Sequence, residues 1–245
     1  QTRYGKRDVF LLKFDASGNQ VWVRQFGSIE EDAGYGVAVN LGSVYVAGWT
    51  SGSLPGQSSS GSRDAFIRQY DSEGNEGWTK QFGPSYPALA YGVAANDGAV
   101  YVVGQTKGTL PGQLRAGDWD AFVRRYSVTG DEVWTRQLGT RAKDFGTDVA
   151  LDGAGNVYVA GFTDGIFPNQ VPAGLTDSYV RQYTGDGQEV WTRQFGTPAQ
   201  EIDTRLAVDQ AGGVSVTGHT YGAFPGQTYS GAEDNYLRGY DAAGN

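Results

Sequence analysis

One element of about twenty residues recurs along the whole chain, and this repeat restricts the fold more than any other feature. Four full copies occupy residues 8–27, 64–83, 120–139 and 177–196, and a fifth begins at Asp234. Each full copy has one tryptophan, and the successive spacings are 56, 56 and 57 residues: Trp22, Trp78, Trp134 and Trp191. A repeat of this length predicts an array of similar structural units that bury their cores against one another.

Each repeat contains four strand-like segments, and none of them has a helical period. The first two are apolar, as in residues 34–40 and 43–50, and the other two are the halves of the recurring element. In its first half, Arg68 and Ile67 point to opposite faces, so both faces carry large side chains. We therefore predict an all-β fold, a β-propeller of four-stranded antiparallel blades with about 56 residues per repeat. A solenoid fits less well, because its repeats are shorter and rarely hold four antiparallel strands.

The connections predict two different faces of the disc. The turns inside the recurring element are short and contain a late glycine, which favours tight hairpins. The loop from residue 50 to residue 63 and its equivalents are long, and the connections from one repeat to the next vary most. Because the strands alternate in direction, all long loops lie at one end of the blades, where function is usually found.

The repeats do not fill a whole number of blades. We divide the single domain, residues 1–245, into blade parts at 1–27, 33–83, 89–139, 145–196 and 202–245. Two strands from the first part, three from the last and four from each of the others make 17, which is four repeats plus an extra N-terminal strand. The chain is then an excerpt of a larger ring, a small closed ring completed by residues 21–26, or a subunit whose terminal strands complete a neighbour.

The third arrangement predicts a homo-oligomer or filament. Its interface consists of the strands at the two ends of the chain. The predicted assembly residues are Val9, Phe10, Leu11, Phe14, Val21, Trp22, Tyr236, Leu237 and Tyr240.

The composition excludes several classes of function. The chain has no cysteine and one histidine, His219, so it has neither a thiol nucleophile nor a multi-histidine metal site. The net charge of −8 argues against a nucleic-acid partner, and no apolar run approaches the roughly 20 residues of a membrane span. We predict no metal, no cofactor and no catalytic residues. We interpret the acidic cluster Glu30–Asp32 as a solvated loop rather than a calcium site.

Basic residues recur in two registers of the recurring element. Arg68 and its equivalents occupy one register, and Arg24 and its equivalents occupy the other, nearly always between aromatic residues. We interpret both registers as contacts between blades. The arginines either stack on aromatic rings or pair with Asp64 and its equivalents.

A few aromatic and polar positions differ from blade to blade near the long loops. They predict an asymmetric surface for a glycan or a surface protein, or else aromatic packing between blades. These residues are Trp49, Tyr86, Trp119, Phe162, His219 and Tyr221.

The repeated frame also resembles a known family. Its parts are NVYVAGFT at residues 156–163, DAFIRQYD at residues 64–71 and VWTRQFG at residues 190–196. This frame resembles the bacterial β-propeller repeat family abbreviated SBBP, with NHL-like four-stranded blades, along nearly the whole chain. The resemblance implies an extracellular or cell-surface location and seven blades, although this chain holds about four repeats.

Together these observations predict a non-enzymatic extracellular scaffold with structural or interaction roles. Its sharper form assembles into oligomers or filaments by strand complementation between the incomplete terminal blades. The alternative is a propeller module that binds a carbohydrate or a protein. A third hypothesis is a glycoside-acting enzyme that uses a pair of carboxylates.

Overall fold

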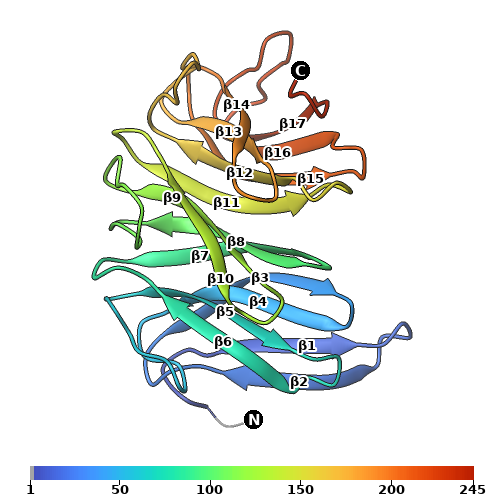
Figure 1. Cartoon of the computed structure of the whole chain (residues 1–245). Coiled ribbons are helices and arrows are strands. Elements are labelled where there is room, and N and C mark those ends of the chain that lie inside the picture. Colours follow the sequence, from blue (N-terminus) through green and yellow to red (C-terminus); the bar gives the residue numbers. More distant parts are fainter. Residues whose placement is uncertain (1–2) are drawn as a thin grey trace.

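The computed structural model describes residues 3–245 as a stack of five β-sheets in which no residue is helical (Figure 1). The outer sheets have two and three strands, and the three sheets between them have four each. The strands are β1 (Val9–Phe14), β2 (Gln20–Phe26), β3 (Asp32–Asn40), β4 (Ser43–Thr50), β5 (Asp64–Tyr70), β6 (Glu76–Phe82), β7 (Ala88–Asn96), β8 (Ala99–Thr106), β9 (Asp120–Tyr126), β10 (Glu132–Leu138), β11 (Asp144–Leu151), β12 (Val157–Thr163), β13 (Asp177–Tyr183), β14 (Glu189–Phe195), β15 (Glu201–Val208), β16 (Val214–Thr220) and β17 (Asp234–Tyr240).

Each complete blade is an antiparallel meander whose strands bury both faces. All eight residues of β8 are buried, and in β5 both Phe66 and Ile67 are fully buried although they point in opposite directions. A strand covered on both sides must carry apolar side chains at successive positions, which explains the weak alternation of these segments. The all-β propeller architecture and the 17 strands predicted from the sequence are confirmed.

The hairpins close through side chains that bind their own backbone. In the β5–β6 turn, the Asp71 carboxylate accepts hydrogen bonds from the backbone N–H groups of Glu73 (3.0 Å) and Asn75 (2.7 Å). Gly74 adopts a φ of 79°, a left-handed conformation that completes the turn. The pattern Asp-x-x-Gly-Asn is therefore used for turn geometry, and its carboxylate is already occupied by the chain.

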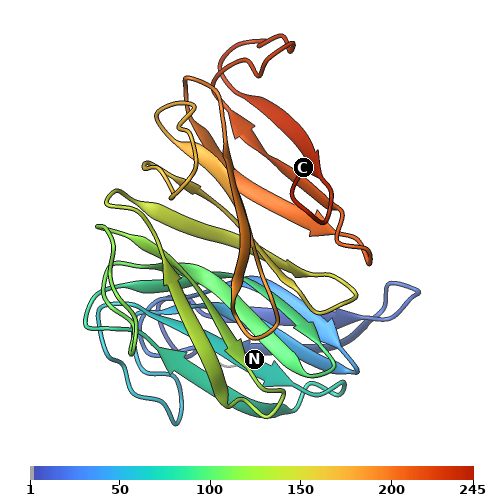
Figure 2. The ribbon, with the colours of Figure 1, turned by 45° about the horizontal axis from the view of Figure 1, so that its top comes forward.

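The five sheets form an open arc and not a closed ring. The first strands of the blades follow one another at the inside, with β3 packed on β7, β7 on β11 and β11 on β15. The first and last sheets lie at opposite ends of the stack, as the colours of Figures 1 and 2 show. The hypothesis of a small closed ring is wrong for this structure, because β2 pairs with β1 and does not complete the sheet of β17.

A tryptophan on each fourth strand, including that of the two-stranded first sheet, clamps the next blade. The Trp78 indole N–H donates a 3.0 Å hydrogen bond to the Val128 carbonyl, in the turn between β9 and β10. The ring covers Gly130, whose φ is 87° and where an added Cβ would lie 2.7 Å from the indole. The same bond recurs at the other three junctions: Trp22 to Ser72 (3.0 Å), Trp134 to Gly185 (3.1 Å) and Trp191 to Ala242 (3.2 Å).

Most of the repeated basic residues contact a neighbouring blade, as predicted, whereas Arg181 lies over Phe167 of its own blade. On the fourth strands, the Arg136 Nε donates to the Gly187 carbonyl of the next turn at 2.8 Å. On the third strands, the Arg68 guanidinium lies 4.2 Å from the centre of the Phe26 ring in the preceding blade.

The predicted pairing of these arginines with the aspartates is wrong. Arg68 instead pairs with Glu76, with Nη1 and Oε2 at 3.3 Å, and the same pair recurs as Arg124–Glu132 and Arg181–Glu189. The Asp64 carboxylate is occupied differently, because it accepts hydrogen bonds from Ser60 and Gln81.

None of the described residues belongs to a helix long and apolar enough to cross a membrane.

The clamp predicts that Gly130→Ala lowers the free energy of unfolding by more than the cost of placing an alanine in the left-handed conformation. A left-handed alanine costs about 1–2 kcal/mol, and the clash with the Trp78 ring adds to that cost. Gly112→Ala is the matched control, because Gly112 has a φ of 72° and no heavy atom within 4 Å of an added Cβ. Urea unfolding followed by tryptophan fluorescence measures both losses, and equal losses would contradict the clamp.

Candidate functional site

A glutamine on the fourth strand anchors the long loop of every complete blade. In the third blade part, the Gln137 Oε1 accepts a hydrogen bond from the Leu110 N–H at 2.9 Å. Its Nε2 donates to the Gly108 carbonyl at 3.0 Å and to the Asp120 carboxylate at 2.7 Å. The Gln137 backbone N–H donates to the Gln113 side chain at 3.0 Å. One residue thus ties its own strand to the loop and to the start of the third strand.

The same four bonds recur, with distances between 2.7 and 3.1 Å, around Gln81 and Gln194. We call the four groups that surround this glutamine the glutamine socket. It consists of two backbone groups of the loop, a loop glutamine and the first aspartate of the third strand. The apolar residue before the loop proline is buried beneath the socket, as Leu54, Leu110 and Phe167 show.

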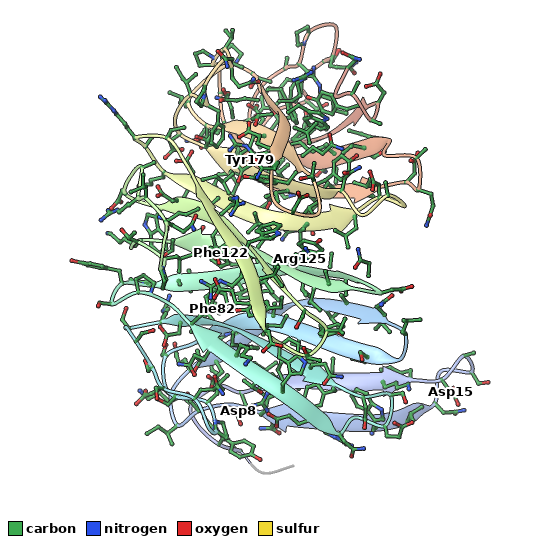
Figure 3. The ribbon with its side chains drawn as sticks, viewed as in Figure 1. Asp8, Asp15, Phe82, Phe122, Arg125 and Tyr179 are labelled. Carbon is green, nitrogen blue, oxygen red and sulfur yellow. The ribbon has the colours of Figure 1, made fainter. Side chains whose placement is uncertain are left out.

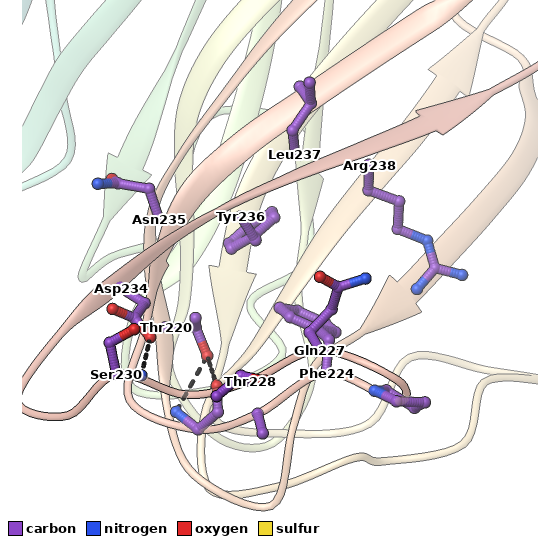
Figure 4. Close-up of a pocket in the computed structure, with 13 residues that line it drawn as sticks. Thr220, Phe224, Gln227, Thr228, Ser230, Asp234, Asn235, Tyr236, Leu237 and Arg238 are labelled. Carbon is purple, nitrogen blue, oxygen red and sulfur yellow. Dashed lines mark hydrogen bonds between the residues drawn. The ribbon is translucent and has the colours of Figure 1, made fainter.

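The last blade has the socket but lacks the strand that fills it. β17 is an edge strand, and a groove of about 810 Å³ lies beside it (Figure 4). All four equivalent residues line the groove: Gly222, Phe224, Gln227 and Asp234. Among the described residues, the Phe224 N–H and the Gln227 side chain make no hydrogen bond. The groove therefore presents the four groups that hold the fourth strand in the complete blades.

The first sheet lacks the two strands that the last blade has at its inner side. It holds the third and fourth strands of a blade, and the inner edge of β1 is unpaired. Phe10 and Phe14 on β1 are 70% and 56% exposed. The neighbouring β3 exposes Tyr35, Val37 and Val39. In β7, by contrast, Val93, which is the equivalent of Val37, is buried. These apolar side chains lie where a complete blade would place its first two strands.

The predicted assembly residues divide into two groups. Some are already used inside the chain: Val9, Trp22, Tyr236 and Tyr240 are buried, and Leu11 is half-buried. The others are exposed and free to contact another molecule: Phe10, Phe14, Val21 and Leu237. The two ends of the chain are not brought together within one molecule, because β1–β2 and β17 belong to the outermost sheets.

The six predicted ligand-face residues are spread over several blades. Trp49 is buried, with the Arg63 guanidinium 4.4 Å from its ring centre, and Phe162 stacks on Phe145 of the same sheet. Trp119 is half-buried and Tyr86 is 57% exposed.

Two of the six residues meet in the last blade. Glu233 joins His219 and Tyr221, since one of its carboxylate oxygens contacts the imidazole and the other accepts the Tyr221 hydroxyl.

The acidic residues serve the backbone. Asp32 is buried and accepts a 2.7 Å hydrogen bond from the Ser28 N–H, so interpreting this residue as solvated was wrong. Asp120 and Asp144 flank Gly139, and the carboxylate of each accepts hydrogen bonds from backbone N–H groups. Figure 3 shows how the side chains fill the space between the sheets. Within residues 3–245, no three acidic, histidine or cysteine side chains are grouped closely enough to hold a metal ion.

The sequence contained a signal for the socket that our interpretation did not use. The fourth strands carry Gln25, Gln81, Gln137 and Gln194 at one register. A polar residue repeated without change in an otherwise apolar blade indicates a fixed hydrogen-bond partner. The partner itself lies 24 to 29 residues earlier in the loop, and only the fold shows that they meet.

Comparisons with known proteins agree with the repeat. A family model described as a β-propeller repeat, SBBP, matches residues 133–168, from β10 to the loop after β12. The regulatory protein FlaEY of Caulobacter vibrioides is 34% identical over 170 residues. This match covers 61% of the present chain and 18% of FlaEY, so the matched region spans less than a fifth of that relative. The predicted β-propeller repeat is confirmed.

A solved structure is similar over most of the chain. It is a protein of unknown function from Bacteroides caccae, with 12% identity and a TM-score of 0.47. The similarity covers 86% of the present chain and 65% of the other.

The socket predicts unequal effects of two glutamine substitutions. Gln137→Ala removes three side-chain bonds and leaves the Leu110 backbone N–H unpaired, which costs about 1–3 kcal/mol. Gln227→Ala, in the unfilled socket, is expected to change the free energy of unfolding by less than about 0.5 kcal/mol. Chemical denaturation of both variants measures the difference, and a loss at Gln227 as large as that at Gln137 would refute the assignment.

Asp144 predicts a specific pH dependence of stability. Burial raises the pKa of Asp144, so the folded chain holds its proton more tightly than the unfolded chain. The contribution of Asp144 to stability is then present below about pH 4 and is lost as pH rises through the folded pKa. The unfolding free energy of the wild type minus that of Asp144→Asn should fall between pH 4 and pH 7.

Asp71→Asn is the control for this experiment. Hydrogen bonds from Asn75 lower the pKa of Asp71, so its contribution is lost only when pH falls below about 4. The difference between wild type and Asp71→Asn should stay constant from pH 5 to pH 7. A rising difference for Asp144→Asn over the same interval would contradict the assignment.

Proposed function

We propose that this chain, which is built from β-propeller repeats, is a non-enzymatic interaction scaffold that associates with further copies of itself through its two incomplete terminal blades. The observation that carries the proposal is the preformed groove beside β17, with its unfilled glutamine socket. A β-strand edge with unpaired backbone groups is a template for another strand. Here the edge also retains the side chains that complete blades use to hold one.

Exposure at the two ends supports an interface. Leu237 is 79% exposed, whereas the residues at the same register of the complete blades, Ile67, Val123 and Val180, are fully buried. Exposed apolar side chains of Phe10 and Phe14 lie at the other end of the arc. The ends therefore present apolar surface that similar blades cover elsewhere in the same chain, which favours association between ends.

A non-catalytic role agrees with the similarity to a protein named as a regulatory protein. A glycoside-acting enzyme would require a pair of carboxylates, and the neighbouring Asp120 and Asp144 carboxylates both accept hydrogen bonds from the backbone. We place the scaffold outside the cell or at its surface, as the resemblance to the repeat family implies. Detection of the protein in culture supernatant or by surface labelling of intact cells tests this placement.

The proposal predicts that the chain self-associates and that Leu237→Lys weakens the association by about tenfold or more, because a charge would replace an apolar contact. Leu114→Lys is the matched control, because Leu114 is 89% exposed on the long loop of a complete blade. Sedimentation equilibrium over a range of concentrations measures the association. A wild-type chain that stays monomeric at high concentration would overturn the proposal.

A further inference from the structure

We propose that residues 20–27 of a second copy bind in the groove beside β17 as the missing fourth strand, with the donor Gln25 in the glutamine socket. The inference rests on the proposed function and specifies its partner strand, register and recognition residue. In the exchange, β1 of the donor moves away from β2, and the donor β2 pairs with β17 of the acceptor.

The first argument is the match between donor and socket. In the donor chain, the Gln25 Nε2 already donates a 2.6 Å hydrogen bond to the Asp8 carboxylate, as Gln81 does to Asp64. Asp234 is the equivalent aspartate of the acceptor and lines the groove, together with the Phe224 N–H and Gln227. The exchange thus replaces one aspartate by another and adds bonds to the loop of the acceptor.

A second hollow beside β17 fits the donor tryptophan. In complete blades a tyrosine of the second strand contacts the tryptophan of the fourth strand. The ring centres of Tyr45 and Trp78, for example, are 6.0 Å apart. The last blade has Ser215 at the tyrosine register and Gly239 as its neighbour on β17. Both residues line a separate hollow of about 620 Å³. A strand with Trp22 and Gln25 three residues apart would therefore occupy both hollows at once.

A third argument is that β2 can change its partner strand while it stays packed on the next blade of its own chain. The Trp22 indole and the Arg24 guanidinium hold β2 to the next blade through the Ser72 and Gly74 carbonyls, at 3.0 and 2.5 Å. These bonds do not involve β1. The strand that must move is β1, whose Phe10 and Phe14 are already exposed.

The exchange would also cover the apolar surface beside the first sheet. In complete junctions, the first strand of one blade packs on the first strand of the next, as β3 does on β7. The acceptor β15 would take the equivalent position next to β3 of the donor. Tyr35, Val37 and Val39, which are 57%, 59% and 67% exposed, lie on that strand.

The register of complete blades predicts which residues face each other. Arg68 lies opposite Thr79 in the β5–β6 pair, and Leu12 lies opposite Val23 in the β1–β2 pair. In the exchanged pair, Val23 of the donor should therefore lie opposite Arg238 of the acceptor. Opposed residues of antiparallel strands have Cα atoms about 4.5–5.5 Å apart, which a disulfide can bridge.

Disulfide trapping in the full chain tests this register. The chain has no cysteine of its own, so every disulfide reports an introduced pair. Val23→Cys combined with Arg238→Cys should give covalent dimers and longer chains under mild oxidation. Val23→Cys combined with Asn235→Cys, which is three residues out of register, should give at least about tenfold less product. Arg238→Cys alone controls for bonds between two acceptor strands.

A peptide with the sequence of residues 20–27 tests the recognition residue. Labelled Gln-Val-Trp-Val-Arg-Gln-Phe-Gly should bind the dilute full chain, and alanine at the position of Gln25 should weaken binding by about tenfold. Gln227→Ala in the full chain should weaken it similarly. Gln57→Ala, which alters a filled socket, should leave peptide affinity unchanged.

The outcomes separate this inference from the proposed function. A chain that self-associates in a manner sensitive to Leu237→Lys, but gives equal product from both cysteine pairs, retains the proposed function and overturns the strand assignment. Peptide binding by a chain that remains monomeric overturns the assignment of a second copy as donor. Unchanged affinity after the Gln25 and Gln227 substitutions overturns the role of the socket.

Discussion

The contacts of the fourth strand hold this arc together, because that strand binds its own blade and the following blade at the same time. Its glutamine fixes the long loop of its own blade, as Gln137 does through Leu110 and Gly108. Its tryptophan reaches the next turn, as Trp134 does at Gly185. A blade without this strand therefore lacks both its loop anchor and its link to a further blade, which is why we propose that the end of the arc receives another strand.

The two terminal blades differ from the others in ways that follow from their neighbours. In complete blades a buried arginine lies over an aromatic ring and pairs with a glutamate, and in two of them the ring belongs to the preceding blade, as Arg124 shows with Phe82 and Glu132. The first sheet has no preceding blade, and there Leu12 and Gln20 replace the arginine and the glutamate. The last sheet has a preceding blade but no fourth strand, and there Arg238 lies over the Phe195 ring with no glutamate partner among the described residues.

Much of the fold could be predicted because the sequence repeats. The spacing of the tryptophans, the turn glycines and the apolar segments were sufficient for the blade plan, the 17 strands and the incomplete ends. The burial of Trp49 was open from sequence, because an aromatic residue near a loop can face solvent or a neighbouring blade. Only packing decides, and the Arg63 side chain lies over its ring.

The groove beside β17 was harder to foresee than the strands. Its four groups come from two loop positions, a loop glutamine and a strand aspartate, which meet only when the blade is folded. The wrong pairing of Arg68 with Asp64 had the same origin. Both residues lie on one strand, four positions apart, and Glu76 reaches the arginine only because the hairpin brings β6 alongside β5.

The direction of the tryptophan clamp has a consequence for how the chain is made. Each indole bonds to a turn that lies 50 or 51 residues closer to the C-terminus. On a ribosome adding roughly 5–20 residues per second, Trp22 would wait about 3–10 seconds for its acceptor. Each new blade is thus locked only by the emergence of its successor, so the nascent arc always carries one unlocked blade at its growing end.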